Sequence, residues 1–357
     1  LGDVYKRQGH NYHETEVFGA NLNATTQWKL GRTSMGVEFR NEGVKSNVLG
    51  KPMKEPQDVP FEKEGQYLKS DNRSNISYFL EHNVLLRRFT LSVGVLANYN
   101  SALNEGIHFY PGIDASYRIG DNFRLYGSWN RALRMPTFTD LYYEGKTNKG
   151  NPDLKPEESE AFEVGLKYNT YFLRAHIAGF YRKGKNMIDW VKEKPEDIWE
   201  SRNLTKVDNL GFETNLSLLP RELGNERFFI RKIELGYAFI HQDKDSEGYI
   251  SNYALDYLKH KFTAQLSHSI WKGFSATWYV RWQDRAGSYT KYENLKPAYE
   301  EPYAPYCLVD MKVNWEYQRL NLYAELNNLL NSTYYDLGNI PQPGIWFKAG
   351  FRYSFKY

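Results

Sequence analysis

The chain has 357 residues, of which 16% are aromatic, and its 46 basic and 43 acidic residues leave a net charge of +3. This balance excludes the strongly basic footprint of a nucleic-acid-binding domain, so we expect no nucleic-acid partner. No stretch of 18 or more apolar residues occurs, which excludes a transmembrane helix, although strands with alternating polar side chains can still cross a bilayer as a barrel.

The first eight residues differ in character from the rest of the chain. They contain no apolar segment of a signal peptide, and Asp3 to Gln8 resemble the translation of a transposon-end sequencing adaptor. We therefore interpret residues 1–8 as an artefact of library preparation and residues 9–357 as the protein. On this interpretation the chain is a fragment whose upstream part is absent.

From residue 14 onwards, apolar and polar side chains alternate in long segments. Because successive side chains of a β-strand point to opposite faces, each segment predicts a strand with one apolar and one polar face. Most segments reach or exceed the roughly 9–11 tilted residues that cross a bilayer. About fifteen strands are predicted, at 14–30, 33–44, 73–86, 89–99, 108–119, 123–132, 160–169, 172–182, 204–219, 228–241, 255–270, 274–282, 306–317, 320–329 and 345–357.

The connections between these strands alternate between short and long. Tight turns are predicted at 30–32, 86–88, 120–122, 170–171, 271–273 and 318–319, and long loops at 45–69, 133–157, 183–202, 242–252, 283–305 and 331–344. Pro52, Pro56 and Pro60 favour a loop for the first of these, because proline cannot donate to a strand ladder. Transmembrane barrels have short periplasmic turns and long outer loops, whereas a soluble β-sandwich gives no reason for this alternation.

The last segment shows the pattern most clearly. Ile345, Phe347, Phe351 and Phe355 fall on one face, and Trp346 with charged or small residues falls on the other. A terminal strand of this kind resembles the closing strand of outer-membrane barrels. If the last strand runs inward, alternation makes the first strand run inward too, so an antiparallel partner for the first strand is expected upstream.

Two segments between predicted strands carry the most specific signal. Ser128 to Tyr143 contains Arg-Ala-Leu-Arg-Met-Pro, and Gly150 to Ser159 begins Gly-Asn-Pro-Asp-Leu-Lys-Pro-Glu. In this order they resemble the barrel of TonB-dependent outer-membrane receptors, in which Arg-Ala-x-Arg-x-Pro precedes Gly-Asn-Pro-x-Leu-x-Pro-Glu. Later blocks, such as Glu325 to Asn331 and Ile340 to Gly344, are most similar to the vitamin B12 receptor branch.

The resemblance implies an all-β fold, a transmembrane antiparallel β-barrel. This chain would supply about 15 of 22 strands and stay open where the N-terminal strands are missing. It also implies an N-terminal plug domain, absent here, through which the TonB complex acts. The expected function is TonB-energised uptake of a scarce, bulky nutrient, a corrinoid or an iron–siderophore. The chain would lie in the lipid of the bacterial outer membrane, with no cofactor and no catalytic activity.

Ligand contacts are expected in the long loops, because aromatic side chains suit a large, flat, partly apolar ligand. The alternative is that aromatic residues near strand ends form girdles at the membrane interface. Arg131 and Arg134 could pair an anionic siderophore or a plug carboxylate, or instead form salt bridges within the wall, for example with Glu163 or Asp310. The candidate ligand-binding residues are Tyr142, Tyr143, Trp190, Trp199, Tyr299, Tyr303, Tyr306 and Arg134.

Two other functions share parts of this pattern. A passive outer-membrane porin would have the same barrel without a plug. A β-rich hydrolase would need paired carboxylates across a cleft, and Glu157, Glu158 and Glu160 lie instead at a loop-to-strand edge. No Gly-x-Ser-x-Gly elbow, phosphate loop or His-Glu-x-x-His sequence occurs.

Metal-ligand residues are sparse. Cys307 is the single cysteine, and its place on the apolar face of a strand predicts a small buried side chain. His10, His13, Glu14 and Glu16 are close in sequence and could form a metal site, but a flexible or solvated segment is the favoured interpretation. No metal is therefore expected.

Overall fold

The structure, a computed structural model, describes residues 10–355 except 104–105, 195, 225–226, 246–247, 252–256, 294–295 and 339. The proposed adaptor segment, residues 1–8, lies outside the described residues. The described part is almost entirely strand, with a short helix α2 (Phe138–Tyr142) and a 3-10 turn η1 (Pro220–Leu223). Within the described residues, no helix is both long and apolar enough to cross a membrane.

The main sheet contains 18 strands, and fifteen long strands remain when the short strands β3, β8 and β13 are set aside. The long strands are β1 (His13–Trp28), β2 (Gly31–Ser46), β4 (Gln66–Leu85), β5 (Phe89–Asn100), β6 (Ile107–Ile119), β7 (Phe123–Arg134), β9 (Glu157–Asn169), β10 (Leu173–Lys192), β11 (Trp199–Leu218), β12 (Ile230–Asp245), β14 (Leu258–Ser269), β15 (Phe274–Arg285), β18 (Tyr306–Tyr317), β19 (Leu320–Asn327) and β22 (Trp346–Tyr353). Each corresponds to one predicted strand, which confirms the fold class.

The short strands lie in the long connections. They are β3 (Lys51–Asp58), β8 (Asn148–Lys149), β13 (Ile250–Ser251), β16 (Ser288–Glu293), β17 (Lys296–Pro302), β20 (Tyr335–Leu337) and β21 (Ile340–Pro341). The pairs β16–β17 and β20–β21 form two small sheets of their own.

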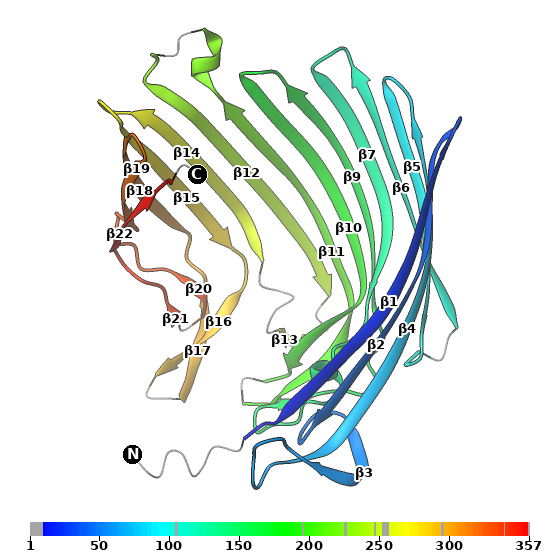
Figure 1. Cartoon of the computed structure of the whole chain (residues 1–357). Coiled ribbons are helices and arrows are strands. Elements are labelled where there is room, and N and C mark those ends of the chain that lie inside the picture. The colour runs from blue at the N-terminus through cyan, green and yellow to red at the C-terminus, as the bar shows by residue number, and fades with distance from the viewer. Residues whose placement is uncertain are drawn as a thin grey trace.

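Each long strand pairs antiparallel with the next long strand along the chain, from β1 to β22. The sheet curves into a barrel wall that is not closed, because an open gap separates β22 from β1 (Figure 1). The tight turns gather at the upper end of Figure 1, and the long connections, with β3, β13, β16 and β17, gather at the lower end. The predicted alternation of short and long connections is therefore confirmed.

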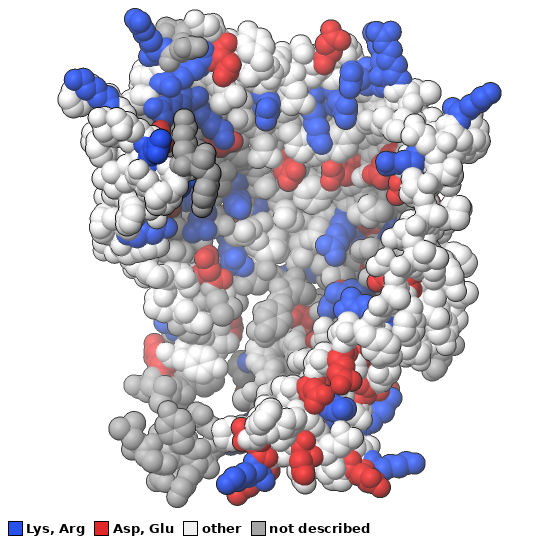
Figure 2. All heavy atoms as spheres, in the orientation of Figure 1, with Lys and Arg blue, Asp and Glu red and all other residues white. Residues whose placement is uncertain are grey.

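The two faces of the wall differ in polarity, as the alternation predicts. Apolar side chains on the outer face are left uncovered, for example Val164 (63% exposed) and Phe351 (75% exposed), as expected for a face that meets lipid rather than a protein core. The intervening polar side chains line the hollow. Figure 2 shows charged side chains inside the hollow and at both ends, while the outer flanks are largely uncharged.

Three predicted loops contain more strand than the sequence indicated. The loop at 45–69 includes β3, which pairs on one side with β4 through a register shift between Pro52 and Gln57. Pro52 and Pro56 therefore lie in an edge strand, and Pro60 lies in the turn that follows it. The loop at 183–202 is shorter than predicted, because β10 and β11 stay paired as far as Val191 and Glu200. The loop at 283–305 folds into the β16–β17 hairpin.

The last strand is shorter than the predicted 345–357. It pairs with β19 from Trp346 to Tyr353, and its ladder ends where β19 begins at Leu320. Residues 356–357 lie outside the described residues. Cys307, expected to be buried, is half-buried on β18.

Candidate functional site at the long-loop mouth

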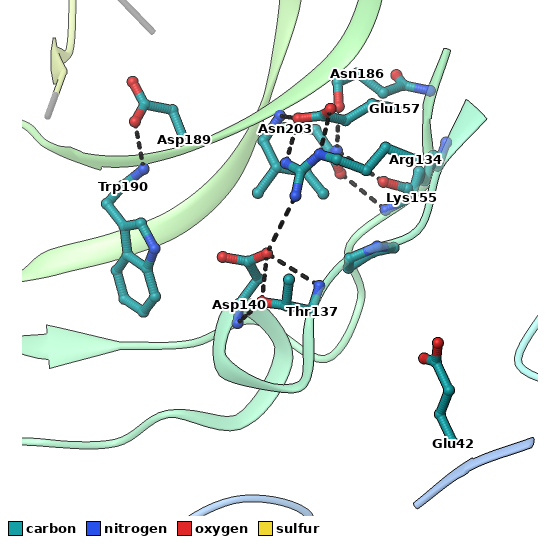
Figure 3. A network of polar contacts seen from close by, with 12 residues as sticks. Glu42, Arg134, Thr137, Asp140, Lys155, Glu157, Asn186, Asp189, Trp190 and Asn203 are labelled. Atoms are coloured by element: carbon teal, nitrogen blue, oxygen red, sulfur yellow. Dashed lines mark hydrogen bonds and ion pairs between the residues drawn. The ribbon is translucent and has the colours of Figure 1, made fainter. Parts of the chain in front are cut away.

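The shortest ion pair that joins the two motif segments is between Arg134 at the end of β7 and Glu157 at the start of β9 (Figure 3). Arg134 donates from Nε to Glu157 Oε2 and from Nη2 to Glu157 Oε1, both at 2.6 Å. Glu157 is buried and also accepts a hydrogen bond from the backbone N–H of Ile188 at 2.7 Å. A two-pronged charged pair of this kind holds both partners in a defined geometry.

Between these two residues lies the motif loop, residues 135–156. It begins with a capping box: Thr137 Oγ1 accepts from the Asp140 N–H at 3.1 Å, and Asp140 Oδ2 accepts from the Thr137 N–H at 3.0 Å. These bonds satisfy amide groups that the single-turn helix α2 would otherwise leave unpaired. Asp140 Oδ2 also lies 3.9 Å from Arg134 Nη1, so the helix start is tied to the ion pair.

On one side, the motif loop is tethered to β4. The Arg73 guanidinium donates to the Pro136 carbonyl at 2.6 Å and lies 4.9 Å from the centroid of the Phe138 ring. The Tyr142 hydroxyl donates to Asp71 Oδ2 at 2.7 Å. Burial and this hydrogen bond raise the pKa of the Tyr142 phenol well above its ordinary value, so it stays a donor.

On the other side, the motif loop is tethered to β10 and β11. The Asn203 amide accepts from the Lys155 N–H and donates to the Lys155 carbonyl, both at 2.9 Å, and it donates to the Asn186 carbonyl at 2.7 Å (Figure 3). The short strand β8 pairs parallel with Trp199 and Glu200. The motif loop therefore spans part of the mouth and is held at both ends.

The two predicted tryptophans lie in the β10–β11 hairpin. Trp190 is only 8% exposed, so its ring lies largely within the protein. Trp199 donates its backbone N–H to the Thr147 carbonyl at 2.8 Å, and Lys192 Nζ lies 4.5 Å from the centroid of its ring. Next to Trp190, Asp189 is almost fully buried and accepts from the Ser251 hydroxyl.

A second group of aromatic side chains, the tyrosine cluster, gathers where β16, β18 and β20 meet. The ring of Tyr289 lies 5.1 Å from that of Tyr303 and 5.7 Å from that of Tyr335, and the ring of Tyr306 lies 4.7 Å from that of Tyr334. The Tyr306 hydroxyl lies 2.5 Å from both Gln283 Oε1 and Asp336 Oδ1, and can donate to one of them at a time.

Three cations border the tyrosine cluster. Arg285 lies 5.5 Å from the Tyr303 ring, Arg281 lies 5.9 Å from the Tyr306 ring, and Lys291 lies 5.9 Å from the Tyr289 ring. At these distances a cation and an aromatic face attract each other. The cluster therefore places aromatic faces, hydroxyl groups and positive charge close together.

The structure brings some predicted site residues together and separates others. Tyr142 and Arg134 belong to the motif loop network, and Tyr143 follows α2 as its half-buried C-cap. Tyr303 and Tyr306 meet in the tyrosine cluster, whereas Tyr299 on β17 is 53% exposed. Sequence reasoning did not select Tyr289, Tyr334 or Tyr335, which complete the cluster; the Tyr334-Tyr335 pair was a usable signal. Whether any of these residues contacts ligand stays a prediction.

The two arginines follow the wall-salt-bridge alternative, with other partners than those expected. Arg134 binds Glu157, and Arg131 Nη2 lies 3.8 Å from Glu158 Oε2. Glu163 instead accepts from the Tyr126 hydroxyl at 2.8 Å, and Asp310 accepts from the Asn328 N–H at 2.7 Å. Glu163 and Asp310 do lie on the predicted polar face. The register between β7 and β9, however, places Glu157 and Glu158 nearer to the two arginines.

No group of three or more His, Cys, Asp and Glu side chains in the described residues is arranged to hold a metal ion. Near the N-terminal end of β1, His13 Nδ1 instead lies 2.8 Å from Ser46 Oγ, and Glu14 lies 3.7 Å from Lys45 Nζ.

The sheet is curved and antiparallel, its strands are apolar on the outer face and polar on the inner face, and a tethered loop crosses one mouth. These features define the wall of an outer-membrane β-barrel. The chain belongs to the TonB-dependent receptor family: the family model described as TonB dependent receptor-like, beta-barrel, matches residues 2–329. This confirms the resemblance predicted from the motif segments and places the chain in the bacterial outer membrane. The tight turns then mark the periplasmic end of the wall, and the long loops the outer end.

Among curated relatives, the chain is similar to the vitamin B12 transporter BtuB of Vibrio vulnificus, with 26% identity over 225 residues, 47% of this chain and 36% of the relative. It is also similar to the ferrienterobactin receptor of Escherichia coli, with 22% identity over 297 residues, 75% of this chain and 38% of the relative. The chain thus spans little more than a third of the length of these relatives. Both relatives are named for transport or reception.

Solved structures show the same fold. A mutant of the ferric enterobactin receptor of Pseudomonas aeruginosa, in complex with enterobactin, matches with a TM-score of 0.72 and 19% identity, covering 96% of this chain and 55% of that one. The FrpB iron transporter of Neisseria meningitidis matches with a TM-score of 0.71 and 15% identity, covering 99% of this chain and 57% of that one. At these identities the likeness establishes the fold alone.

Proposed function

We propose that this chain forms the barrel wall of a receptor that takes up a scarce, bulky nutrient, a corrinoid or an iron–siderophore. In this proposal a plug domain fills the lumen, the TonB complex supplies energy through that plug, and no catalysis occurs. The observation that carries the proposal is the outer mouth itself, where a tethered motif loop and a cluster of tyrosines with bordering cations face the entrance of a polar lumen. Aromatic and cationic groups together suit a large ligand with flat and anionic parts.

Within this mouth we propose that ligand contacts come from the eight predicted residues, aided by Tyr289, Tyr334 and Tyr335. The ring faces of Tyr299, Tyr303 and Trp199 are the foremost candidates, because Tyr299 is exposed and the other two already lie near cations. Tyr142 and Arg134 would act by holding the motif loop, since their polar atoms are engaged by Asp71 and Glu157.

Uptake by the intact receptor tests the proposal. The whole gene would be expressed in a strain that lacks its own cobalamin and siderophore receptors, and uptake of labelled cobalamin and of radioactive iron chelates would be measured with and without TonB. We expect saturable, TonB-dependent uptake of one of the two ligand classes. Uptake of small solutes that is unsaturable and independent of TonB would support the passive porin, and reproducible turnover of generic esters or glycosides would support the hydrolase.

A further inference from the structure

Three cations form a row on the inner wall near the periplasmic end. Arg118 on β6 is the direct cross-strand partner of Arg124 on β7, and Arg124 is the direct partner of Lys167 on β9. Side chains at directly opposite positions lie roughly 4.5–5.5 Å apart at Cβ, and like charges there repel. All three residues are exposed, and we call them the cation row.

The cation row faces the lumen rather than the lipid. Its neighbours in sequence, Tyr117, Ile119, Phe123 and Leu125, are exposed apolar residues of the outer face, so alternation directs Arg118 and Arg124 inward. Lys167 borders a cavity of about 730 Å³ in the inner wall. Figure 2 shows several Lys and Arg side chains on this upper part of the inner wall.

The three cations of the row lack carboxylate partners, whereas some other inner-wall cations have them. Lys312 and Lys348 share Glu325 at 2.7 and 2.5 Å, and Lys232 lies 2.8 Å from Glu234. By contrast, none of the three cations of the row forms an ion pair with a carboxylate of the described residues.

The nearest carboxylate on the Lys167 strand is engaged elsewhere. Lys167 Nζ lies 4.6 Å from the centroid of the Tyr126 ring, and the hydroxyl of Tyr126 is the group that contacts Glu163. The wall therefore positions three neighbouring positive charges, and carboxylates that neutralise them would have to come from outside the described part of the wall. In an empty lumen water would screen them, but a domain that fills the lumen removes much of that water.

We propose that the cation row is a docking surface for an acidic polypeptide segment seated inside the barrel. Neighbouring strands are about 4.8 Å apart, so the row extends roughly 10 Å across the wall, and carboxylates at alternate positions of an extended segment recur about every 6.8 Å. Long Arg and Lys side chains reach such a pattern easily. A flat, exposed row suits an extended chain better than a small ion, which needs donors that close around it.

The proposal rests on the proposed function, because it takes a polypeptide domain of the receptor to fill the lumen. The first test is photo-cross-linking in the intact receptor, in its outer membrane, with p-benzoylphenylalanine at Ser116, the lumenal position on β6 beside Arg118. We expect a cross-link to a segment of the same polypeptide that carries at least two Asp or Glu residues. A cross-link to a segment without acidic residues, or no cross-link to polypeptide, would overturn the docking surface.

The second test compares two triple variants of the intact receptor. Arg118→Gln/Arg124→Gln/Lys167→Gln removes the cation row, and Arg87→Gln/Lys272→Gln/Arg319→Gln removes three cations from the tight turns at the same end. Because three exposed ion pairs would be lost, we expect protease cleavage of the lumenal domain to rise about tenfold in the first variant, with little change in the second. Equal cleavage in both variants, with barrel folding intact by heat-modifiable electrophoretic mobility, contradicts the proposal.

Uptake by the wild-type receptor separates the two levels of inference. If nutrient uptake fails while the acidic cross-link forms, the proposed function is wrong and the docking surface stands. If uptake is TonB-dependent while the cross-linked segment carries no acidic residues, the proposed function stands and the docking surface is wrong.

Discussion

Tyr142 and Asp71 are 71 positions apart in the sequence, yet the Tyr142 hydroxyl donates to Asp71 Oδ2 at 2.7 Å and ties the motif loop to β4. Replacing Tyr142 with Phe removes this bond and leaves Asp71 with Lys51, which lies 3.6 Å away. We expect the motif loop to lose about 1–2 kcal/mol of local stability, measured as faster hydrogen exchange over residues 137–150.

The matched control for this prediction is Tyr143→Phe. The Tyr143 hydroxyl makes no hydrogen bond within the described residues, so its removal should leave exchange in the motif loop unchanged. Equal acceleration in the two variants would mean that ring packing, and not the bond to Asp71, holds the loop.

Glu157→Gln is expected to be the most damaging single change at the mouth. The buried carboxylate of Glu157 receives two hydrogen bonds from Arg134 and one from Ile188, and an amide cannot satisfy all three donors. Because Arg134 is half exposed, we expect a moderate loss of about 1–3 kcal/mol in the free energy of loop opening, measured by limited proteolysis of residues 135–156.

Glu158→Gln tests whether charge alone explains that effect. Glu158 lies 3.8 Å from Arg131, and both side chains are about 40% exposed, so solvent screens the pair. We expect the free energy of loop opening to fall by less than about 1 kcal/mol. A Glu158 variant as labile as the Glu157 variant would contradict the special role of the joint between the two motif segments.

The tyrosine cluster should determine ligand affinity if the proposed function holds. Tyr303→Ala removes a ring that packs at a tilt against Tyr289 and lies near the Arg285 guanidinium. Loss of one aromatic contact is expected to raise the dissociation constant of the transported ligand about tenfold, measured by equilibrium binding to the intact receptor. Tyr292→Ala, on the same hairpin but 53% exposed and without a ring partner in the described residues, should leave affinity nearly unchanged.

The β16–β17 hairpin is expected to loosen in acid. Lys291 Nζ lies 2.9 Å from Glu301 Oε2, the Tyr289 hydroxyl donates to the same oxygen at 3.1 Å, and together they lower the pKa of Glu301 below its ordinary value of 4.5. Because the folded-state pKa is lowered, ionised Glu301 stabilises the hairpin fully above pH 4.5. This contribution is lost as the pH falls through the lowered pKa.

Hydrogen exchange across the hairpin, corrected for its intrinsic pH dependence, would measure this transition. Glu301→Gln should abolish it and leave the hairpin less protected at neutral pH. Glu293→Gln, at an exposed position of the same hairpin, should retain the wild-type profile. An acid transition that persists in the Glu301 variant would assign the pH dependence to another group.

Two glycine turns at the periplasmic end should differ in their tolerance of a methyl group. Gly120 and Gly273 both have positive φ, 65° and 86°, so alanine is strained at either position. A Cβ at Gly273 would lie 2.4 Å from the Glu316 carbonyl oxygen, whereas a Cβ at Gly120 meets nothing within 4 Å. We expect Gly120→Ala to lower the free energy of unfolding by about 1 kcal/mol and Gly273→Ala to lower it clearly more, measured by thermal unfolding of the intact receptor.

The strands could be predicted from the sequence because their signal is local. In a strand that separates lipid from a wet lumen, apolar and polar side chains must alternate at every step. The strand from Phe123 to Arg134 and its neighbours can therefore be recognised from their own residues. Beyond the bilayer this requirement ends, and whether chain continues as strand depends on a partner. The pairing of Trp190 with Ser201 and the edge strand at Pro52 therefore could not be predicted from their own residues.

The candidate site was predictable only in part for the same reason. The motif segments mark Arg134 and Glu157, but their bond depends on the β7–β9 register. The tyrosine cluster draws Tyr289 from the connection before β18, Tyr306 from the start of β18 itself and Tyr335 from the connection after β19. No local pattern states which of the 29 tyrosines in the chain will meet.

The double attachment of the motif loop has a mechanical consequence for the mouth. The loop is fixed to β4 through Asp71 and Arg73, and to β11 through Asn203. Any change in the separation of those two strands must bend the loop, stretch it or break one attachment. While both attachments hold, the position of the loop and the width of the entrance therefore change together. A molecule that displaces the loop from outside also deforms the wall.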